Sequence, residues 1–456
     1  MKKKLIFAAA AIAMLASCSQ NDLEAPVVGQ AQQSDAIEFG TYLGKQATSR
    51  AGLAGSMDDT QLRKSEANGG GFGLFAYHTD AGVYNSSSSA PNFMWNQGVF
   101  YDTDWAYTPV KYWPNETSTT NNEEQNSKSA GVDRLTFFAY APYVNPATTG
   151  TFTPAETSGI TSLTSNSTPG DPKIGYTVAG DLDDAVDLLW GVIPAGATAW
   201  ANVTGTDMTS STDPAFTVGK PYLNLLKPNT GQKVNFLFRH ALAKLNVGVQ
   251  VVNDQVDPTS STFDNTNTKV FIKSIKITSK TTDGFGTSGT LNLNNTTANV
   301  PLWESVTKTT ATELDANEEG EIAAALFWSS PADASEKTTQ FGKAGVTQNL
   351  KNIVTGNTPA VTDKGWMVVP TNSKNDFTVN IDYFVMTQDA KLDGGYSIVE
   401  NNITKDISVA APGFEGGFVY QIKLLLGMTS VKVDASVQDW TDGTPVEVDL
   451  PMNVAP

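Results

Sequence analysis

Residues 234–251 carry the pattern that decides the fold, and they read VNFLFRHALAKLNVGVQV. Apolar side chains alternate with polar or small ones at Val234, Phe236 and Phe238, and the alternation resumes from Leu245 to Val251. A period of two residues places such side chains on one face of a β-strand and their neighbours on the other. The stretch therefore predicts two consecutive strands, each with at least one buried face.

The same alternation recurs on both sides of this stretch, between turns rich in Gly, Asn and Asp. Further strands are predicted at 37–43, 72–77, 135–143, 187–193, 275–277, 379–385, 418–426 and 431–437. Thr153 to Pro172 is predicted to be a long polar loop, and the acid-rich Glu313 to Leu326 to form one short helix. Many short strands separated by turns argue for an all-β protein built as antiparallel β-sandwiches.

Chain length indicates the number of domains, and net charge limits the kinds of partner. The chain has 456 residues, which is enough for two domains, and we place the boundary so that residues 36–238 and 239–456 form one domain each. The formal net charge of −17 disfavours nucleic acid and anionic lipid headgroups as partners. A hydrophobic content of 40% is enough for folded cores.

The first residues form a lipoprotein export signal. Lys2 to Lys4 precede an apolar run from Leu5 to Ala16, which is too short to span a bilayer. The run ends in Leu-Ala-Ser-Cys, and Cys18 is the only cysteine of the chain. We therefore predict a signal peptide at 1–17, a diacylglyceryl group on the Cys18 thiol, and a flexible tether over 18–35.

No catalytic, cofactor or metal site is predicted. The two histidines, His78 and His240, stand alone in strand-like runs without a second ligand at metal-binding spacing, so we expect them to be packed or capped. Gly284, Gly286 and Gly289 match the dinucleotide-binding spacing, but strands on both sides favour a hairpin loop.

A cluster of four acidic residues, Asp181, Asp183, Asp184 and Asp187, raises the question of a calcium site. Its spacing matches no calcium loop, so a solvated acidic turn is the preferred interpretation.

The C-terminal residues form an unusually long alternating strip. Five apolar side chains share one face of it, namely Val446, Val448, Leu450, Met452 and Val454. An uncovered apolar strand is an aggregation hazard, so the strip needs a groove, either in its own domain or in another subunit. Pro451 lacks an N–H and removes one rung from any such ladder.

The segment after the first predicted strand is suited to proteolysis. Thr-Ser-Arg-Ala-Gly at 48–52 contains small residues around the isolated Arg50. Exposed stretches of this kind are preferred cleavage sites. Cutting between Arg50 and Ala51 would free the lipidated first strand and open an apolar groove.

These features together resemble the fimbrillins, the type V pilus subunits of Bacteroides-type bacteria. The resemblance rests on the lipobox, Ile-Glu-Phe at 37–39, the Arg50-Ala51 step, Asp-Leu-Leu-Trp at 187–190, residues 236–247 and the ending at 431–440. It implies two tandem transthyretin-like β-sandwich domains and export as an outer-membrane lipoprotein through Cys18. It also implies cleavage after Arg50 by an arginine-specific protease, and polymerisation with other pilus subunits by strand exchange, with residues 441–456 as the donor segment.

The resemblance leads to a structural pilus subunit that serves adhesion, with no catalysis. Stalk, tip and anchor roles stay open. A surface glycan-binding lipoprotein is one alternative, for which Trp95, Trp105 and Trp113 would supply exposed aromatic platforms. A secreted hydrolase on a β scaffold is the other, and it would need convergent carboxylates in a cleft.

Overall fold

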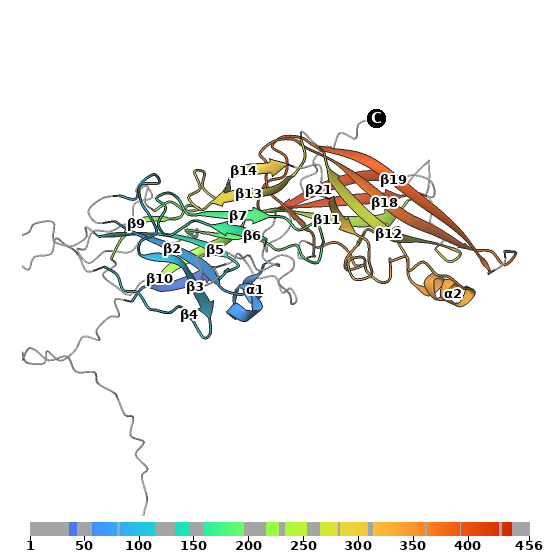
Figure 1. The fold of residues 1–456 in the computed structure, drawn as a ribbon. Helices are drawn as coiled ribbons and strands as arrows, with labels where there is room; N and C mark the ends of the chain where they lie inside the picture. Colours follow the sequence, from blue (N-terminus) through green and yellow to red (C-terminus); the bar gives the residue numbers. More distant parts are fainter. Residues whose placement is uncertain are drawn as a thin grey trace, which may run out of the picture. The chain divides into compact units, whose positions relative to one another are not determined.

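The computed structural model describes residues 36–42, 57–79, 83–114, 133–145, 159–195, 216–227, 233–252, 265–280, 283–308, 313–360, 363–392, 394–427 and 431–439. These residues form four β-sheets with few helices, which confirms the predicted all-β, sandwich-like fold (Figure 1). Two strand pairs, β1 with β10 and β11 with β20, are parallel, and the other registered pairs within the described ranges are antiparallel.

The largest sheet has the strand order β1-β10-β8-β5-β2-β3-β4, with β9 paired to β5. Its strands are β1 (Glu38–Tyr42), β2 (Phe72–Thr79), β3 (Met94–Tyr101), β4 (Trp105–Ala106), β5 (Arg134–Ala141), β8 (Leu189–Val192), β9 (Tyr222–Leu226) and β10 (Lys233–His240). Both faces of its centre are buried, since the first six residues of β2 and the last seven of β5 are inaccessible. A central strand buried on both faces reads as a continuous apolar run, as β5 does.

A four-stranded sheet covers one of these faces. It has the order β14-β13-β7-β6 and contains β6 (Ile160–Leu163), β7 (Lys173–Thr177), β13 (Gly286–Asn292) and β14 (Leu302–Lys308). Its Tyr176, Leu291 and Trp303 belong to the same apolar cluster as Phe75 and Tyr140 of the large sheet. The two sheets therefore form the first sandwich.

The second sandwich is built from the two remaining sheets. One has the order β16-β11-β20-β21, with β17 also paired to β11, and the other has the order β15-β12-β18-β19. The strands are β11 (Ala243–Val251), β16 (Lys351–Asn352), β17 (Trp366–Val368), β20 (Phe418–Leu426), β21 (Val431–Asp439), β12 (Thr268–Ser279), β15 (Glu313–Ala316), β18 (Asn375–Gln388) and β19 (Tyr396–Val409). Their inward faces share one core, in which Val247, Ile275, Ile381 and Leu424 are fully or nearly fully buried.

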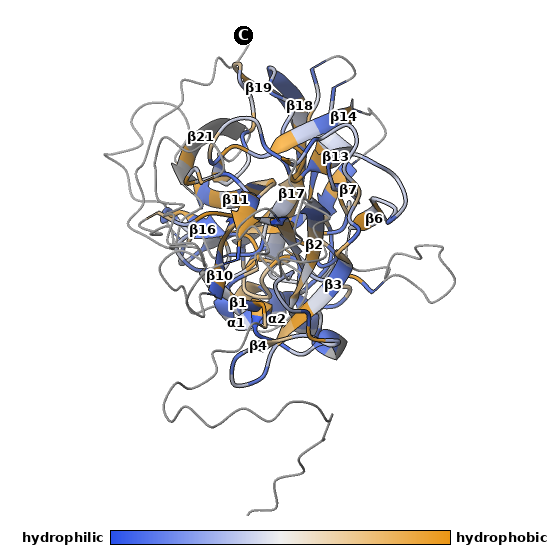
Figure 2. Cartoon of the chain, turned by 90° about the vertical axis from the view of Figure 1, so that its left-hand side faces the viewer, coloured by the Kyte–Doolittle hydropathy of each residue, from blue (hydrophilic) through white to orange (hydrophobic). Residues whose placement is uncertain are grey.

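Within the described ranges, three short helices lie outside the sheets. They are α1 (Asp59–Leu62), the 3-10 helix η1 (Glu66–Asn68) and α2 (Ala334–Gly342). The Asp58 and Asp333 side chains cap the first turns of α1 and α2 by accepting from Gln61 N and Glu336 N. Figure 2 shows that both polar and apolar residues line the strands, as expected for sheets with interior and exterior faces.

Two local predictions from the sequence are wrong. Glu313 to Leu326 does not form a helix, because β15 occupies its start and pairs with β12, which buries Leu314 and Ala316 in the second core. Thr153 to Pro172 is not entirely loop, since it contains β6, whose Ile160 is buried in the first sandwich. In both places tertiary packing outweighs the local polar composition.

The two halves of the chain share a sheet. β10 ends at His240 in the first sandwich, and β11 begins at Ala243 in the second, close to the predicted boundary. β13, which lies in the second half, nevertheless pairs with β7 in the first, from Ser288 opposite Thr177 to Asn292 opposite Lys173. The assignment of residues 36–238 and 239–456 to separate domains stays a prediction.

The shared sheet leads to a test by mutation. Leu291 is fully buried between the two sheets of the first sandwich, so Leu291→Ala should lower the free energy of unfolding by about 2–5 kcal/mol. Amide exchange should accelerate in β7 as well as in β13, because the two strands share a hydrogen-bonded ladder. Urea denaturation and hydrogen exchange measure these effects. Val300→Ala, at a residue 47% exposed, is the matched control and should change stability by no more than about 0.5 kcal/mol. Unchanged exchange in β7 would contradict the prediction.

Candidate functional site

The first strand, β1, is the terminal strand of the large sheet and runs parallel to β10, with Glu38 opposite Lys233 and Tyr42 opposite Leu237. On its other side, Ala36 bridges Tyr112 and the Ile37 amide donates to the Lys111 carbonyl over 2.9 Å. β1 thus lies between β10 and the segment that follows β4. In Figure 2, β1 and β10 are labelled next to each other.

The side chains of β1 alternate as the sequence predicts. Ile37 and Phe39 are 2% and 1% exposed, whereas Glu38 between them is exposed. The Phe39 ring lies 5.9 Å from the Phe137 ring and 6.4 Å from the Phe236 ring, centroid to centroid. Burying these two side chains contributes about 1.5–3 kcal/mol each. An apolar slot would be exposed if β1 were removed.

Three further contacts hold β1 in this slot. The Tyr107 hydroxyl donates to the Ile37 carbonyl over 2.9 Å, and its ring lies 5.4 Å from that of Phe39. Burial is the largest cause of the raised pKa of Tyr107, so its hydroxyl remains a donor at neutral pH. Gly40 lets β1 approach β10, because a Cβ there would lie 2.2 Å from Asn235 Oδ1.

A buried carboxylate, that of Asp187, holds the backbone at Met57. Asp187 Oδ2 accepts from the Met57 amide over 3.0 Å and lies 2.6 Å from His240 Nδ1. The Asp187 side chain is fully buried and that of His240 is 13% exposed. Met57 itself packs in the same apolar cluster as Ile37 and Phe39. This contact joins three distant parts of the chain, and sequence spacing gives no signal for it.

Asp187 is therefore not part of a solvated acidic turn, and that part of the interpretation was wrong. Asp181 accepts from the Asp183 amide over 2.8 Å, and Asp183 pairs with Lys364 over 2.7 Å. Within the described ranges, no group of three or more His, Cys, Asp or Glu side chains is placed to hold a metal ion.

His78, Gly286 and Gly289 are the other residues discussed from the sequence. His78 Nε2 lies 3.3 Å from Asp133 Oδ1, so both histidines contact a carboxylate. Gly286 begins β13, and the strand continues through Gly289. Across the described part of the chain, no helix is both long and apolar enough to cross a bilayer.

The expectation of exposed aromatic side chains is wrong for two of the three tryptophans. Trp105 and Trp113 are 9% and 4% exposed, and their rings pack 5.2 Å from Phe72 and 6.0 Å from Phe137. They belong to the core beneath β1 and present no exposed face. Trp95 is half-buried and donates through Nε1 to the Thr164 carbonyl over 2.6 Å.

The remaining predicted site residues lie outside the described residues. These are Cys18, Arg50, Ala51, Val446, Val448, Leu450, Met452 and Val454. Their chain positions still relate them to the slot. Arg50 falls between β1 and Met57, and the C-terminal strip follows β21, which pairs antiparallel with β20.

The chain is similar to known fimbrial proteins. No family model matches the chain. A fimbrium subunit, Fim1C, of Phocaeicola vulgatus is 23% identical over 468 residues, covering 99% of this chain and 100% of that protein. A crystal structure of a fimbrial protein from Bacteroides vulgatus has the same fold with a TM-score of 0.55, at 20% identity, covering 89% of this chain and 99% of that one. These likenesses confirm the resemblance carried by the sequence motifs: over nearly its whole length the chain is similar to fimbrial proteins.

Proposed function

We propose that this chain is a structural subunit of a cell-surface pilus, without catalytic activity, that serves adhesion. It is exported as a lipoprotein through Cys18, held at the outer membrane, and cut between Arg50 and Ala51. It then polymerises when residues 441–456 of another subunit replace β1. The observation that carries the proposal is that β1 fills an apolar slot at the end of a sheet and precedes Arg50 in the chain.

The position of β1 makes it separable from the fold. It pairs with one strand of its sheet, and Ile37, just before it, and Phe39, within it, are nearly fully buried apolar side chains. Because Arg50 lies beyond its end, one cut detaches the strand and the lipid from the rest of the chain. Removal leaves unpaired groups on β10 and an apolar surface beneath, which together favour addition of a new strand.

The C-terminal strip matches the needs of that slot. Alternate residues must enter the core, and Val446 to Val454 supply five such residues with polar side chains between them. Each buried apolar side chain contributes about 1.5–3 kcal/mol before the cost of ordering the segment. We expect the five apolar side chains of the strip together to favour the exchanged state.

The Asp187 contact supports the same proposal from the other side of the cut. A mature chain that begins at Ala51 has six residues before Met57, whose amide donates to Asp187. Because that anchor lies in the apolar cluster beneath β1, the core keeps its contact with the new terminal region when β1 leaves.

The cleavage step is tested at Arg50. Filament subunits should begin at Ala51, and Arg50→Ala should leave lipidated, unassembled protein at the outer membrane, because β1 stays in its slot. Arg50→Lys should behave like Arg50→Ala if the protease requires arginine, while Lys45→Ala in the same connection should be processed normally. N-terminal sequencing and filament yield from sheared cells provide the measurement. Filaments whose subunits begin at Cys18 would contradict the maturation step.

The donor role is tested at the C-terminus. Deleting residues 443–456 should abolish assembly and leave the melting temperature of the isolated monomer nearly unchanged. Val448→Asp should also block assembly, since a buried unpaired carboxylate is costly. Asn453→Asp places the same carboxylate on the opposite face of the strip and should be tolerated. If the deleted monomer is destabilised and still polymerises, the segment belongs to its own domain.

The anchor at Met57 is tested by stability. Asp187→Asn keeps the shape but removes the charge that the Met57 amide and His240 face, and should lower the free energy of unfolding by about 1.5–3 kcal/mol. The control Asp183→Asn removes a half-exposed carboxylate paired with Lys364 and should cost less than about 1 kcal/mol. Urea denaturation of the two variants decides the matter. Equal effects would show that Asp187 is not an anchor.

A further inference from the structure

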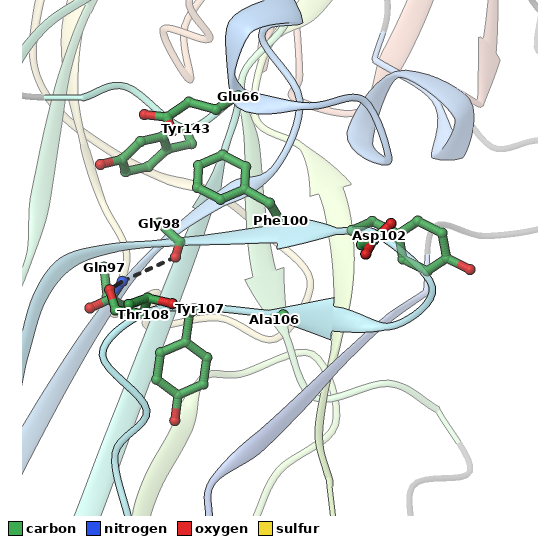
Figure 3. Close-up of a pocket in the computed structure, with 10 residues that line it drawn as sticks. Glu66, Gln97, Gly98, Phe100, Asp102, Ala106, Tyr107, Thr108 and Tyr143 are labelled. Atoms are coloured by element: carbon green, nitrogen blue, oxygen red, sulfur yellow. Dashed lines mark hydrogen bonds between the residues drawn. The ribbon is translucent and has the colours of Figure 1, made fainter. Parts of the chain in front are cut away.

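A pocket on the side of the β3–β4 hairpin is the strongest candidate for a ligand site. Its volume is about 430 Å³, within the range of roughly 300–1,000 Å³ typical of small-molecule sites. Helix η1, strands β3 and β4 and the residues after β5 line it. The lining residues are Glu66, Gln97, Gly98, Phe100, Tyr101, Asp102, Ala106, Tyr107, Thr108 and Tyr143 (Figure 3).

Two aromatic rings are held in fixed positions at its wall. Phe100 and Tyr143 meet edge to face, with ring centroids 5.2 Å apart and planes at 87°. A Cβ on Gly98 would lie 2.8 Å from Phe100 Cε2 and 3.0 Å from Tyr143 Cζ, so only glycine lets both rings lie close to β3. In Figure 3, both rings lie on the same side of the hairpin as Glu66.

The polar groups around the rings are mostly acceptors. Glu66 is exposed and accepts one bond, from Asn145 Nδ2 over 3.1 Å, which leaves a second carboxylate oxygen for a ligand. Gln97 Nε2 donates to the Gly98 and Thr108 carbonyls over 3.1 and 3.2 Å, so its orientation is fixed. Burial, followed by the Glu66 charge, raises the pKa of Tyr143 to about 12, so its hydroxyl stays protonated.

Charge excludes anionic ligands. The ten lining residues include Glu66 and Asp102 and no lysine, arginine or histidine. An anion would meet two carboxylates with no compensating charge in the lining.

Ring geometry disfavours a cationic ligand. An aromatic cage for a cation needs ring faces that converge on one point. Phe100 and Tyr143 instead pack edge to face against each other. Tyr107 points to the other side of the hairpin. Tyr101 already has the Arg63 guanidinium 4.3 Å from its ring centroid. A cage cannot form from these rings.

We propose that this pocket binds a neutral carbohydrate. A sugar ring presents an apolar C–H face to an aromatic ring and hydroxyl donors at its rim to carboxylate and amide oxygens. The pocket offers aromatic rings together with acceptor oxygens. Its two carboxylates, Glu66 and Asp102, can accept hydrogen bonds from neutral hydroxyl groups. Tyr107 lines this pocket and also donates to the Ile37 carbonyl, so the pocket adjoins the β1 slot; the assay probes the pocket in the subunit without assembly.

The test is calorimetric titration of the purified full-length chain with a panel of neutral sugars: methyl β-galactoside, methyl α-mannoside, methyl β-glucoside, N-acetylglucosamine and their β-linked disaccharides. At least one should bind with a millimolar or tighter Kd. Glu66→Gln and Tyr143→Ala should each weaken that binding at least about tenfold. The controls Glu400→Gln and Tyr112→Ala make the same changes at exposed positions and should leave it unchanged.

Melting temperatures of all four variants check the fold, and Glu66→Gln, at an exposed residue, keeps the test valid if Tyr143→Ala does not fold. N-acetylneuraminic acid and tetramethylammonium serve as the anionic and cationic probes. The proposal is overturned if no neutral sugar binds, if a charged probe binds while the neutral sugars do not, or if Glu66→Gln leaves binding intact. Filament yield is scored separately, so loss of sugar binding and failure of the pilus assignment are distinguishable.

Discussion

Without β1, strand β10 would be the exposed edge of the large sheet, and the need to cover it organises the first sandwich. A terminal strand exposes unpaired N–H and C=O groups, and here the neighbouring surface is also apolar. β1 supplies backbone partners to β10 and places Ile37 and Phe39 over Phe137 and Phe236. Tyr107 then ties the carbonyl of Ile37 to the segment after β4. Every contact of β1 described above serves one of these two needs, pairing or burial.

Much of this fold was predictable, because alternation is a local signal. The strands that became β10, β11, β18 and β20 carry apolar residues at every second position, whereas β2 and β5 are nearly continuous apolar runs, and both patterns are typical of strands. β1 was predicted on the same grounds, from Ile37 and Phe39. Where one face of a strand enters a core, the period of the sequence reports it directly.

The errors arise where distant contacts decide. Residues 313–316 are acid-rich, yet pairing with β12 and burial of Leu314 make them a strand. α2 was missed because only Gln340 of its nine residues is buried, so no apolar stripe marks it. Trp105 and Trp113 lie in a polar, aromatic-rich stretch that suggests exposure, but the surface beneath β1 needs large side chains. The slot could therefore be foreseen from the sequence. The contacts of Asp187 with Met57 and His240, and the lining of the hairpin pocket, could be found only in the three-dimensional structure.

The pairing of β7 with β13 has a consequence for how the chain reaches this structure. Strands β1 through β10 all precede β13 and β14 along the chain. Until β13 and β14 have formed, the covering sheet has only β6 and β7, and β7 has one ladder partner fewer. Long-range pairings of this kind form slowly and leave intermediates prone to aggregation. The first sandwich is therefore complete only once β13 and β14, from the second half of the chain, have added to β7.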